Sequence, residues 1–211
     1  LAMLGKAAHF CVRMPAFTYI INYEVLHDYM ENVHAPWLLK PRCVFSPIEV
    51  QTLYNTEQVW KALEDLGDNQ SNFLLQQAIS GDIFPIDGIT ADGRVMLSSV
   101  CMTGHTFQQK AMECELADTN VVYPDFEESS RKLKAIQAAG RPALWGVRGV
   151  THTKFLRSHA SGELYFLETS VGTSTAEGIE PVSGINLWEE WARVEVAAMR
   201  KENYSLPQTN K

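Results

Sequence analysis

The sequence from 146 to 191, GVRGVTHTKFLRSHASGELYFLETSVGTSTAEGIEPVSGINLWEEW, predicts two neighbouring strands followed by a helix. Side chains alternate in character through 150–156 and again through 164–170, which is typical of strands. The loop between the two runs is rich in serine and contains Gly162, and these residue types favour turns. The segment therefore indicates an antiparallel hairpin that leads toward the last helix of the chain.

Four polar side chains fall on one face of this predicted hairpin. Residues two apart in a strand point to the same side, so His152 and Lys154 share one face of the first strand, and Glu168 and Ser170 share one face of the second. If the register places Lys154 opposite Glu168, all four groups converge. Polar groups among apolar strand residues cost free energy unless they pair with each other, a ligand or water. The cluster is a candidate site, and a solvated sheet face is the alternative.

Length and composition favour one domain with two lobes. The chain has 211 residues, of which 45% are hydrophobic, and a chain of this size can bury a substantial core. Its net charge of -7 argues against a general nucleic-acid binder, because there is no basic excess to neutralise phosphates along a duplex. The chain begins with Leu1 rather than Met, and the sequence leaves open whether an upstream portion is missing.

Cysteine spacing and hydropathy favour a cytoplasmic protein. The cysteines show no CxxC pair and no metal-like spacing with the histidines; they are Cys11, Cys43, Cys101 and Cys114. This pattern favours reduced thiols over disulfides or a zinc site. No apolar run approaches the roughly 20 residues needed to span a bilayer. We therefore expect no association with a membrane.

Periodicity predicts a first lobe of alternating strands and helices and a second lobe of hairpins. In the first half we expect strands at 16–22, 37–42, 50–54 and 73–79, and helices at 23–33 and 56–66. In the second half we expect a hairpin of 83–90 with 94–100, a helix at 126–139 and a last helix from Asn186 or Leu187 to Lys201. Asn55 or Thr56 is the expected cap of the helix at 56–66. The region 103–124 shows no clear pattern.

Three basic residues of the first lobe are candidate anion contacts. Lys40 follows three apolar residues and precedes a proline, so its ammonium is held at a strand end beside a loop. A lysine in such a place is more often simply solvated, and Lys6 has the same status. Arg42 adds a planar fork that can bind phosphate or carboxylate at two points.

The order of these segments resembles the ATP-grasp superfamily. The resemblance rests on LLKPR, VQTLYNTEQVWKALEDLGD, FLLQQAISGDIFPIDGI, GVTHTKFLRS, LYFLETS and SGINLWEEWA, which follow one another in the sequence. It implies an α+β fold in which two α+β lobes clamp ATP, with an antiparallel sheet in the C-terminal lobe. The expected divisions are an N-terminal lobe at 1–72, a C-terminal lobe at 73–202 and a polar tail at 203–211.

The resemblance also implies a reaction and its components. ATP-grasp carboxylate-amine ligases phosphorylate a substrate carboxylate with ATP to an acylphosphate, which an amine attacks to give an amide and ADP. The implied cofactors are ATP and Mg²⁺, and the implied partners are a small-molecule carboxylate and a small-molecule amine. The sequence identifies neither substrate and leaves the oligomeric state open.

Residue roles follow from position within the resemblance. Lys6 and Lys40 are similar to the nucleotide-contacting lysines, and the stretch from Gln76 through Gln77 and Ala78 to Ile79 is similar to the interlobe strand that pairs with adenine. Glu168 and Ser170 stand at the positions of metal ligands. Arg42 and Lys154 are the candidate catalytic residues.

Several positions depart from the family pattern. The family has an acidic residue where this chain has Lys154, and an ammonium beside Mg²⁺ is electrostatically unfavourable. The phosphate loop has Pro47 and Glu49 in place of glycine, which removes a donor and adds negative charge. Gln76 replaces a glutamate, and an amide can still meet an adenine edge. ETSVGTSTAEG lacks the arginine common after the acidic motif.

Three hypotheses remain open at this point. The chain is a working ligase that uses one metal or takes missing metal ligands from Asp87, Asp92 or Glu163, or it is a degenerate member in which Lys154 and Glu168 form a cross-strand salt bridge. A degenerate member would act as a nucleotide-binding or interaction module. The third hypothesis is a purely structural or partner-binding domain that uses Trp188 and Trp191, although helical spacing favours packing of these tryptophans in the core.

Overall fold

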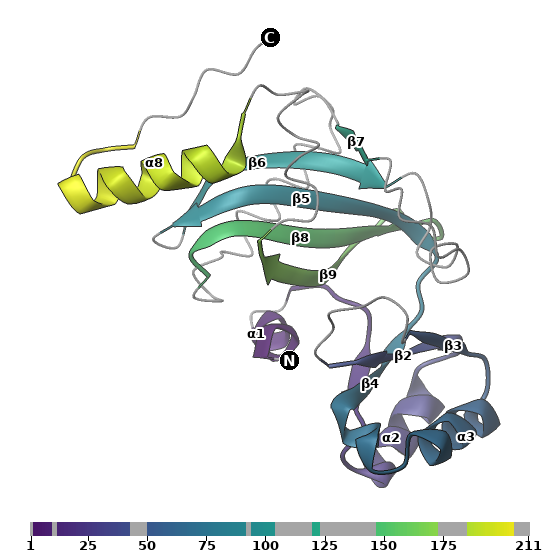
Figure 1. Ribbon diagram of the computed structural model, residues 1–211. Coiled ribbons are helices and arrows are strands. Elements are labelled where there is room, and N and C mark those ends of the chain that lie inside the picture. The colour runs from purple at the N-terminus through teal and green to yellow at the C-terminus, as the bar shows by residue number, and fades with distance from the viewer. Residues whose placement is uncertain are drawn as a thin grey trace.

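The structure, a computed structural model, describes residues 2–9, 12–42, 50–91, 94–103, 120–122, 147–172 and 185–204. Its strands form two antiparallel sheets, one of four strands in the order β1-β4-β2-β3 and one of five in the order β7-β6-β5-β8-β9. The smaller sheet and its helices lie at the lower right of Figure 1, and the larger sheet lies above them. The predicted α+β fold with an antiparallel C-terminal sheet is confirmed.

The smaller sheet and its helices come from the first part of the chain. The elements are β1 (Phe17–Tyr19), α2 (Tyr23–Asn32), β2 (Trp37–Pro41), β3 (Gln51–Leu53), α3 (Thr56–Leu66), the 3₁₀ helix η2 (Gly67–Asn72) and β4 (Phe73–Gln77). Asn55 caps α3 as predicted, because its side chain accepts the backbone N–H of Gln58 at 2.9 Å. Asn22 caps α2 in the same way. The 3₁₀ helix was not predicted.

Alternation along β2 divides the smaller sheet into two faces. Trp37 and Leu39 pack with α2 and α3 in one hydrophobic cluster, so Lys40 points to the opposite face. In β4, Leu75 belongs to the helix-covered cluster, whereas Leu74 packs into a cluster with residues of the larger sheet. The face that carries Lys40 therefore turns toward the larger sheet.

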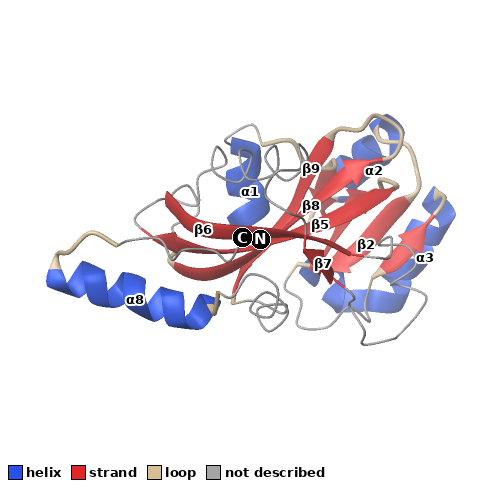
Figure 2. Cartoon of the chain, turned by 90° about the horizontal axis from the view of Figure 1, so that it is seen from above, coloured by secondary structure: helices blue, strands red, loops and turns tan. Residues whose placement is uncertain are grey.

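The larger sheet is built from long strands of the second part of the chain. They are β5 (Gly81–Ala91), β6 (Arg94–Thr103), β7 (Asn120–Val122), β8 (Gly149–Ser158) and β9 (Leu164–Val171), and the helix α8 (Leu187–Arg200) follows them. Helix α8 packs on β5 and β8 through Leu187 and Val194. Seen from above in Figure 2, α8 lies at one end of the molecule, and α2 and α3 lie at the other.

The two sheets meet through a shared apolar cluster. Leu74 of β4 packs with Phe84, Phe155 and Phe166 of the larger sheet. Helix α1 (Ala2–His9), which was not predicted, joins the same cluster and contacts β9. The first residues of the chain thus pack against the larger sheet (Figure 1).

The chain passes between the sheets later than predicted. The expected boundary between 72 and 73 would assign Phe73–Gln77 to the C-terminal lobe, but this strand pairs with β1 and β2 in the smaller sheet. The crossing falls between Gln77 and Gly81. The strand expected at 73–79 ends at Gln77, and the one expected at 16–22 is limited to Phe17–Tyr19 because the chain turns at Ile20 toward the cap of α2.

Some predictions fall on residues that the structure does not describe. These are the helix at 126–139, the turn residues Asp92 and Gly93, the phosphate-loop positions Pro47 and Glu49, and most of the tail at 203–211. Strand β7 lies within the region that the sequence left unassigned. Among the described residues, no helix is long and apolar enough to cross a membrane.

Candidate functional site

Lys154 and Glu168 lie directly opposite each other in the larger sheet. The β8–β9 register pairs Lys154 with Glu168 and His152 with Ser170, so the predicted convergence of four polar groups is confirmed. Nζ of Lys154 donates to Oε1 of Glu168 at 2.8 Å. The two side chains are 37% and 48% exposed, so a ligand can reach the pair. A register shift follows immediately, between Lys154 and Phe155.

Lys40, on the smaller sheet, lies near enough to Lys154 and Glu168 to interact with their charges. Burial lowers the pKa of the Lys40 ammonium, and the nearby charges of Glu168 and Lys154 act on it in opposite directions. Burial opposes ionisation of Glu168, but the charges of Lys154 and Lys40 prevail and hold its pKa below the ordinary value. Three charged groups from two sheets therefore share one neighbourhood.

A buried His–Asp pair lies beside this cluster. Nδ1 of His152 is 2.8 Å from Oδ1 of Asp87 on the neighbouring strand β5, and the side chains are 6% and 0% exposed. Nε2 of His152 is buried without a hydrogen-bond partner. The sequence predicted that His152 belongs to the cluster, but it indicated Asp87 only as a possible substitute metal ligand. The pairing was missed because it depends on the register of β5 with β8, which no local pattern encodes.

Gln76 has a second buried side-chain nitrogen without a hydrogen-bond partner, at the junction of the sheets. Its side chain is 1% exposed, and Nε2 is buried without a partner. It lies in β4 opposite Phe17 and Leu38. Since buried amide donors are nearly always hydrogen-bonded, this orphan donor marks a place that fits a polar ligand edge.

The chain itself already uses two of the backbone donors expected to face adenine. The N–H of Ala78 donates to Pro36 at 2.9 Å, and that of Gln77 donates to Ala16 at 2.8 Å. In this arrangement the N–H groups of Gln77 and Ala78 are therefore not free to pair with a base.

Arg42 and Lys6, the other two candidate anion contacts, lie in different parts of the fold. The guanidinium of Arg42 donates to the Ser71 carbonyl at 2.8 Å and lies over the ring of Tyr19 at 5.3 Å. These contacts hold Arg42 within the smaller lobe. The backbone of Lys6 is in α1, which packs against the larger sheet rather than within the first lobe; its side chain lies outside the described part of the structure.

The residues expected to bind Mg²⁺ do not fit the ion in this arrangement. Mg²⁺ requires near-octahedral oxygen ligands at about 2.0–2.1 Å, but Glu168 Oε1 accepts from an ammonium 2.8 Å away. Of the proposed substitute ligands, Asp87 is buried against His152, and Glu163 forms an ion pair with Arg13. Neither carboxylate adds to the Glu168 position.

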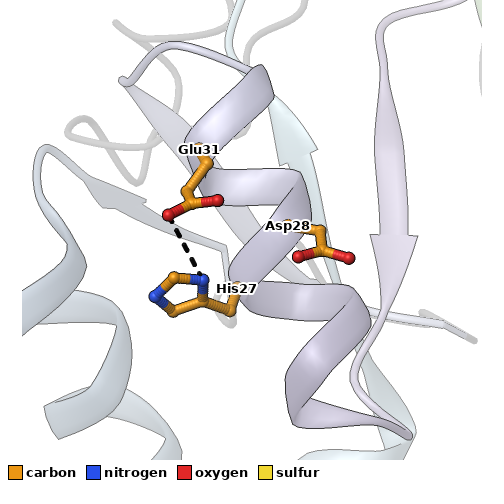
Figure 3. A group of neighbouring side chains, drawn as sticks. All are labelled: His27, Asp28 and Glu31. Atoms are coloured by element: carbon orange, nitrogen blue, oxygen red, sulfur yellow. Dashed lines mark ion pairs between the residues drawn. The ribbon is translucent and has the colours of Figure 1, made fainter.

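One other group of possible metal ligands occurs within the described ranges. His27, Asp28 and Glu31 are all exposed on α2, and Nδ1 of His27 lies 3.6 Å from Oε1 of Glu31 (Figure 3). Helix α2 covers the face of the smaller sheet opposite Lys40. This group is therefore separate from the site between the sheets, and exposed acidic groups of this kind are common on helices.

The fold is shared with solved structures of known proteins. Solved structures with the same arrangement are ATP-grasp ligases, and this chain has the ATP-grasp fold. No protein-family model and no curated protein sequence matches the chain.

Three of the solved structures show how far the likeness extends. L-amino acid ligase from Bacillus licheniformis superposes with a TM-score of 0.64 at 17% identity over 93% of this chain and 46% of its own. The ATP-grasp ligase PsnB, complexed with a minimal precursor, gives 0.62 at 15% identity over 92% and 58%. The biotin carboxylase domain of 2-oxoglutarate carboxylase from Hydrogenobacter thermophilus, in complex with MgADP, ADP and bicarbonate, gives 0.68 at 15% identity over 97% and 45%. The chain spans about half the length of these proteins.

Proposed function

We propose that this chain binds ATP between its two sheets and forms the ATP-binding part of a carboxylate-amine ligase. The observation that supports this most strongly is the meeting of Lys40, from the smaller sheet, with Lys154 and Glu168 of the larger one. Lysine is a compact point charge suited to phosphate. Two such charges on opposite lobes suit a polyphosphate that lies between them.

The nucleobase would lie at the junction of the sheets. The unpaired Nε2 of buried Gln76 supplies a donor for an adenine acceptor, and Leu74 and Phe155 belong to the apolar cluster close by. Gln77 and Ala78 would line this place without donating their N–H groups, which already bond to Ala16 and Pro36. Ile79 would supply the remaining backbone contact, and Lys6 is a further candidate contact to the nucleotide.

The proposed reaction joins two small molecules. A carboxylate oxygen of one substrate attacks the γ-phosphorus of ATP, and ADP leaves; the amine of the other substrate then attacks the acyl carbon, and phosphate leaves. Lys154, more than one-third exposed in the cluster, would offset charge on the transferred group. Arg42 would bind a substrate carboxylate through the guanidinium N–H groups that do not bond to the Ser71 carbonyl.

A specific observation favours a second candidate function. The Lys154–Glu168 ion pair uses the carboxylate where the resemblance places a metal ligand. A chain with this pair can bind nucleotide and yet transfer no phosphoryl group, in which case it acts as a nucleotide-binding module. Ser170, opposite His152, adds only a hydroxyl and does not replace a carboxylate.

Nucleotide binding is tested by titrating ATP and ADP into the chain in a calorimeter. We expect saturable binding that Lys40→Gln weakens by about tenfold or more, since a hydrogen bond to a charged group contributes about 1.5–3 kcal/mol. Lys61→Gln, at an exposed lysine of α3, is the matched control and leaves binding unchanged. An equal effect of the two substitutions would contradict the placement of the phosphates at Lys40.

Carboxylate activation is tested separately with hydroxylamine as the amine. An acylphosphate reacts with hydroxylamine to give a hydroxamate, which can be measured without knowing the natural amine. A panel of small carboxylic acids that yields ATP-dependent hydroxamate supports the ligase. Saturable ATP binding with no hydroxamate from any member of the panel supports the second candidate.

A further inference from the structure

We propose that the ammonium of Lys154 takes the place of a divalent cation at the nucleotide phosphates, so that this chain binds nucleoside di- and triphosphates without metal. This inference rests on the proposed nucleotide site. It concerns how that site neutralises the charge of its ligand.

Lys154 and Glu168 form an ion pair across two neighbouring strands. The two residues are directly paired across β8 and β9, and their charged atoms lie 2.8 Å apart. A metal ion bound by Glu168 would have to share its carboxylate with this ammonium, and two cations on one carboxylate repel each other. The geometry therefore favours the ammonium over a metal at this place.

Charged side chains from both sheets surround Glu168. Lys40 and Lys154 carry two positive charges against the single negative charge of Glu168. Burial destabilises the charged form of Lys40, and a nearby anion would offset that cost. The pair beside it, His152 with Asp87, is satisfied internally at Nδ1. Lys40 and Lys154 thus present two ammonium groups, from opposite sheets, that match a polyphosphate.

The side chain of Lys154 is accessible to a ligand. Lys154 is more than one-third exposed although its β8 neighbours Thr153 and Phe155 are buried. Its three ammonium hydrogens exceed what one oxygen of Glu168 can accept. Lys154 can therefore donate to a phosphate oxygen while it keeps its bond to Glu168. In ATP-dependent phosphoryl transfer a metal ion commonly bridges the β- and γ-phosphates, and here an ammonium would offset part of that charge.

The test is calorimetry of ATP and ADP binding in two buffers, one with excess Mg²⁺ and one with EDTA. We expect dissociation constants in the two buffers that agree within about threefold, a difference of less than 1 kcal/mol. In EDTA, Lys154→Gln weakens binding by about tenfold, whereas Lys154→Arg, which keeps the charge, retains most of it. Lys61→Gln removes one exposed charge far along α3 and serves as the control.

The outcomes separate this inference from the proposed function. Binding that requires Mg²⁺ overturns the inference and leaves the nucleotide site in place. Binding in EDTA that is equally strong for the wild type and for Lys154→Gln also overturns it, provided that thermal unfolding shows both proteins folded. Absence of binding in both buffers overturns the proposed function, and the inference with it. A Lys154→Glu variant that binds ATP only with Mg²⁺ gives independent support, because it restores the acid and with it the need for metal.

Discussion

The side chains of Asp87 and His152 form a hydrogen bond inside the five-stranded sheet. Oδ1 of Asp87 and Nδ1 of His152 lie 2.8 Å apart, and both side chains are nearly inaccessible to solvent. They are register partners in the antiparallel pairing of β5 with β8. Removing one member of a buried pair leaves the other without compensation for its lost hydration. The pair therefore holds the centre of the larger sheet next to the proposed phosphate site.

We expect Asp87→Ala to lower the free energy of unfolding by about 3–5 kcal/mol, the range for breaking a buried pair. Asp87→Asn should cost less, because its amide oxygen can still accept from Nδ1 of His152. Urea unfolding of both variants measures the difference. Asp65→Asn, at an exposed position of α3, is the control and should leave the midpoint almost unchanged; equal effects of Asp87→Ala and Asp65→Asn would contradict the prediction.

Gly81 opens the strand that follows the crossing between the sheets, and it has no room for a side chain. A Cβ at this position would lie 2.2 Å from the carbonyl oxygen of Arg157 and 2.7 Å from Leu156 Cδ2. Because the closest atom belongs to the backbone, the paired strands would have to separate. Gly81→Ala should lower the free energy of unfolding by about 1–3 kcal/mol, as overpacking does.

The matched control for Gly81→Ala is the same substitution at Gly5. A Cβ at Gly5 meets nothing within 4 Å, and Gly5 lies inside α1, where alanine is favoured over glycine by about 0.5–1 kcal/mol. Gly5→Ala should therefore raise the midpoint of thermal unfolding. If both substitutions shift the midpoint in the same direction, the close packing at Gly81 is not what limits stability.

The sequence predicted local features well and long-range pairings poorly. The β8–β9 hairpin, the pairing of Lys154 with Glu168 and the Asn55 cap all depend on residues close in the chain, so alternation and turn chemistry were sufficient. The Asp87–His152 pair joins two residues that are 65 positions apart in the sequence. The local sequence of neither strand determines which strand is its neighbour in the sheet. The place where the chain leaves the smaller sheet was missed for the same reason, because β4 is assigned by its partners β1 and β2.

Acid should weaken the network that ties the crossing segment to the end of β8. Asp82 accepts from Nε2 of His159 at 3.0 Å and from Arg157 at 3.1 Å, and His159 also contacts the hydroxyl of Ser80 at 3.3 Å. The hydrogen bond from His159 lowers the pKa of Asp82; burial opposes it, and Arg157 adds to the lowering. A lowered folded-state pKa means that ionised Asp82 contributes stability above its ordinary pKa of 3.8, and that this contribution disappears as the pH falls through the folded value.

We therefore expect Asp82→Asn to be less stable than the wild type at pH 7, by about 1 kcal/mol or less because the groups are partly exposed. The difference should disappear as the pH is lowered below the ordinary range for aspartate. Urea unfolding of both proteins at intervals from pH 7 to pH 3 measures it. A difference that persists unchanged at pH 3 would show that the substitution acts through packing rather than through the charge of Asp82.

The start of helix α8 offers a direct comparison of two neighbouring residues. Helical spacing predicted that Trp188 and Trp191 pack in the core. Trp191 is partly buried against the cluster that contains Leu187 and Val194, but the prediction is wrong for Trp188, which is 52% exposed. Leu187 is 1% exposed and packs with Ile89 and Val150. Its position fixes α8 on the larger sheet, whereas Trp188 lies outside the contact.

Leu187→Ala should lower the free energy of unfolding by about 2–5 kcal/mol, since it removes buried methyl groups and leaves a cavity. Trp188→Ala should change it by no more than about 0.5 kcal/mol, as is usual for surface substitutions. Urea unfolding of the two variants, with tryptophan fluorescence replaced by circular dichroism so that the lost indole does not distort the signal, gives both values. A loss at Trp188 as large as that at Leu187 would mean that the exposed indole is covered in solution. Size measurement of the wild type would then show whether a second copy of the chain covers it.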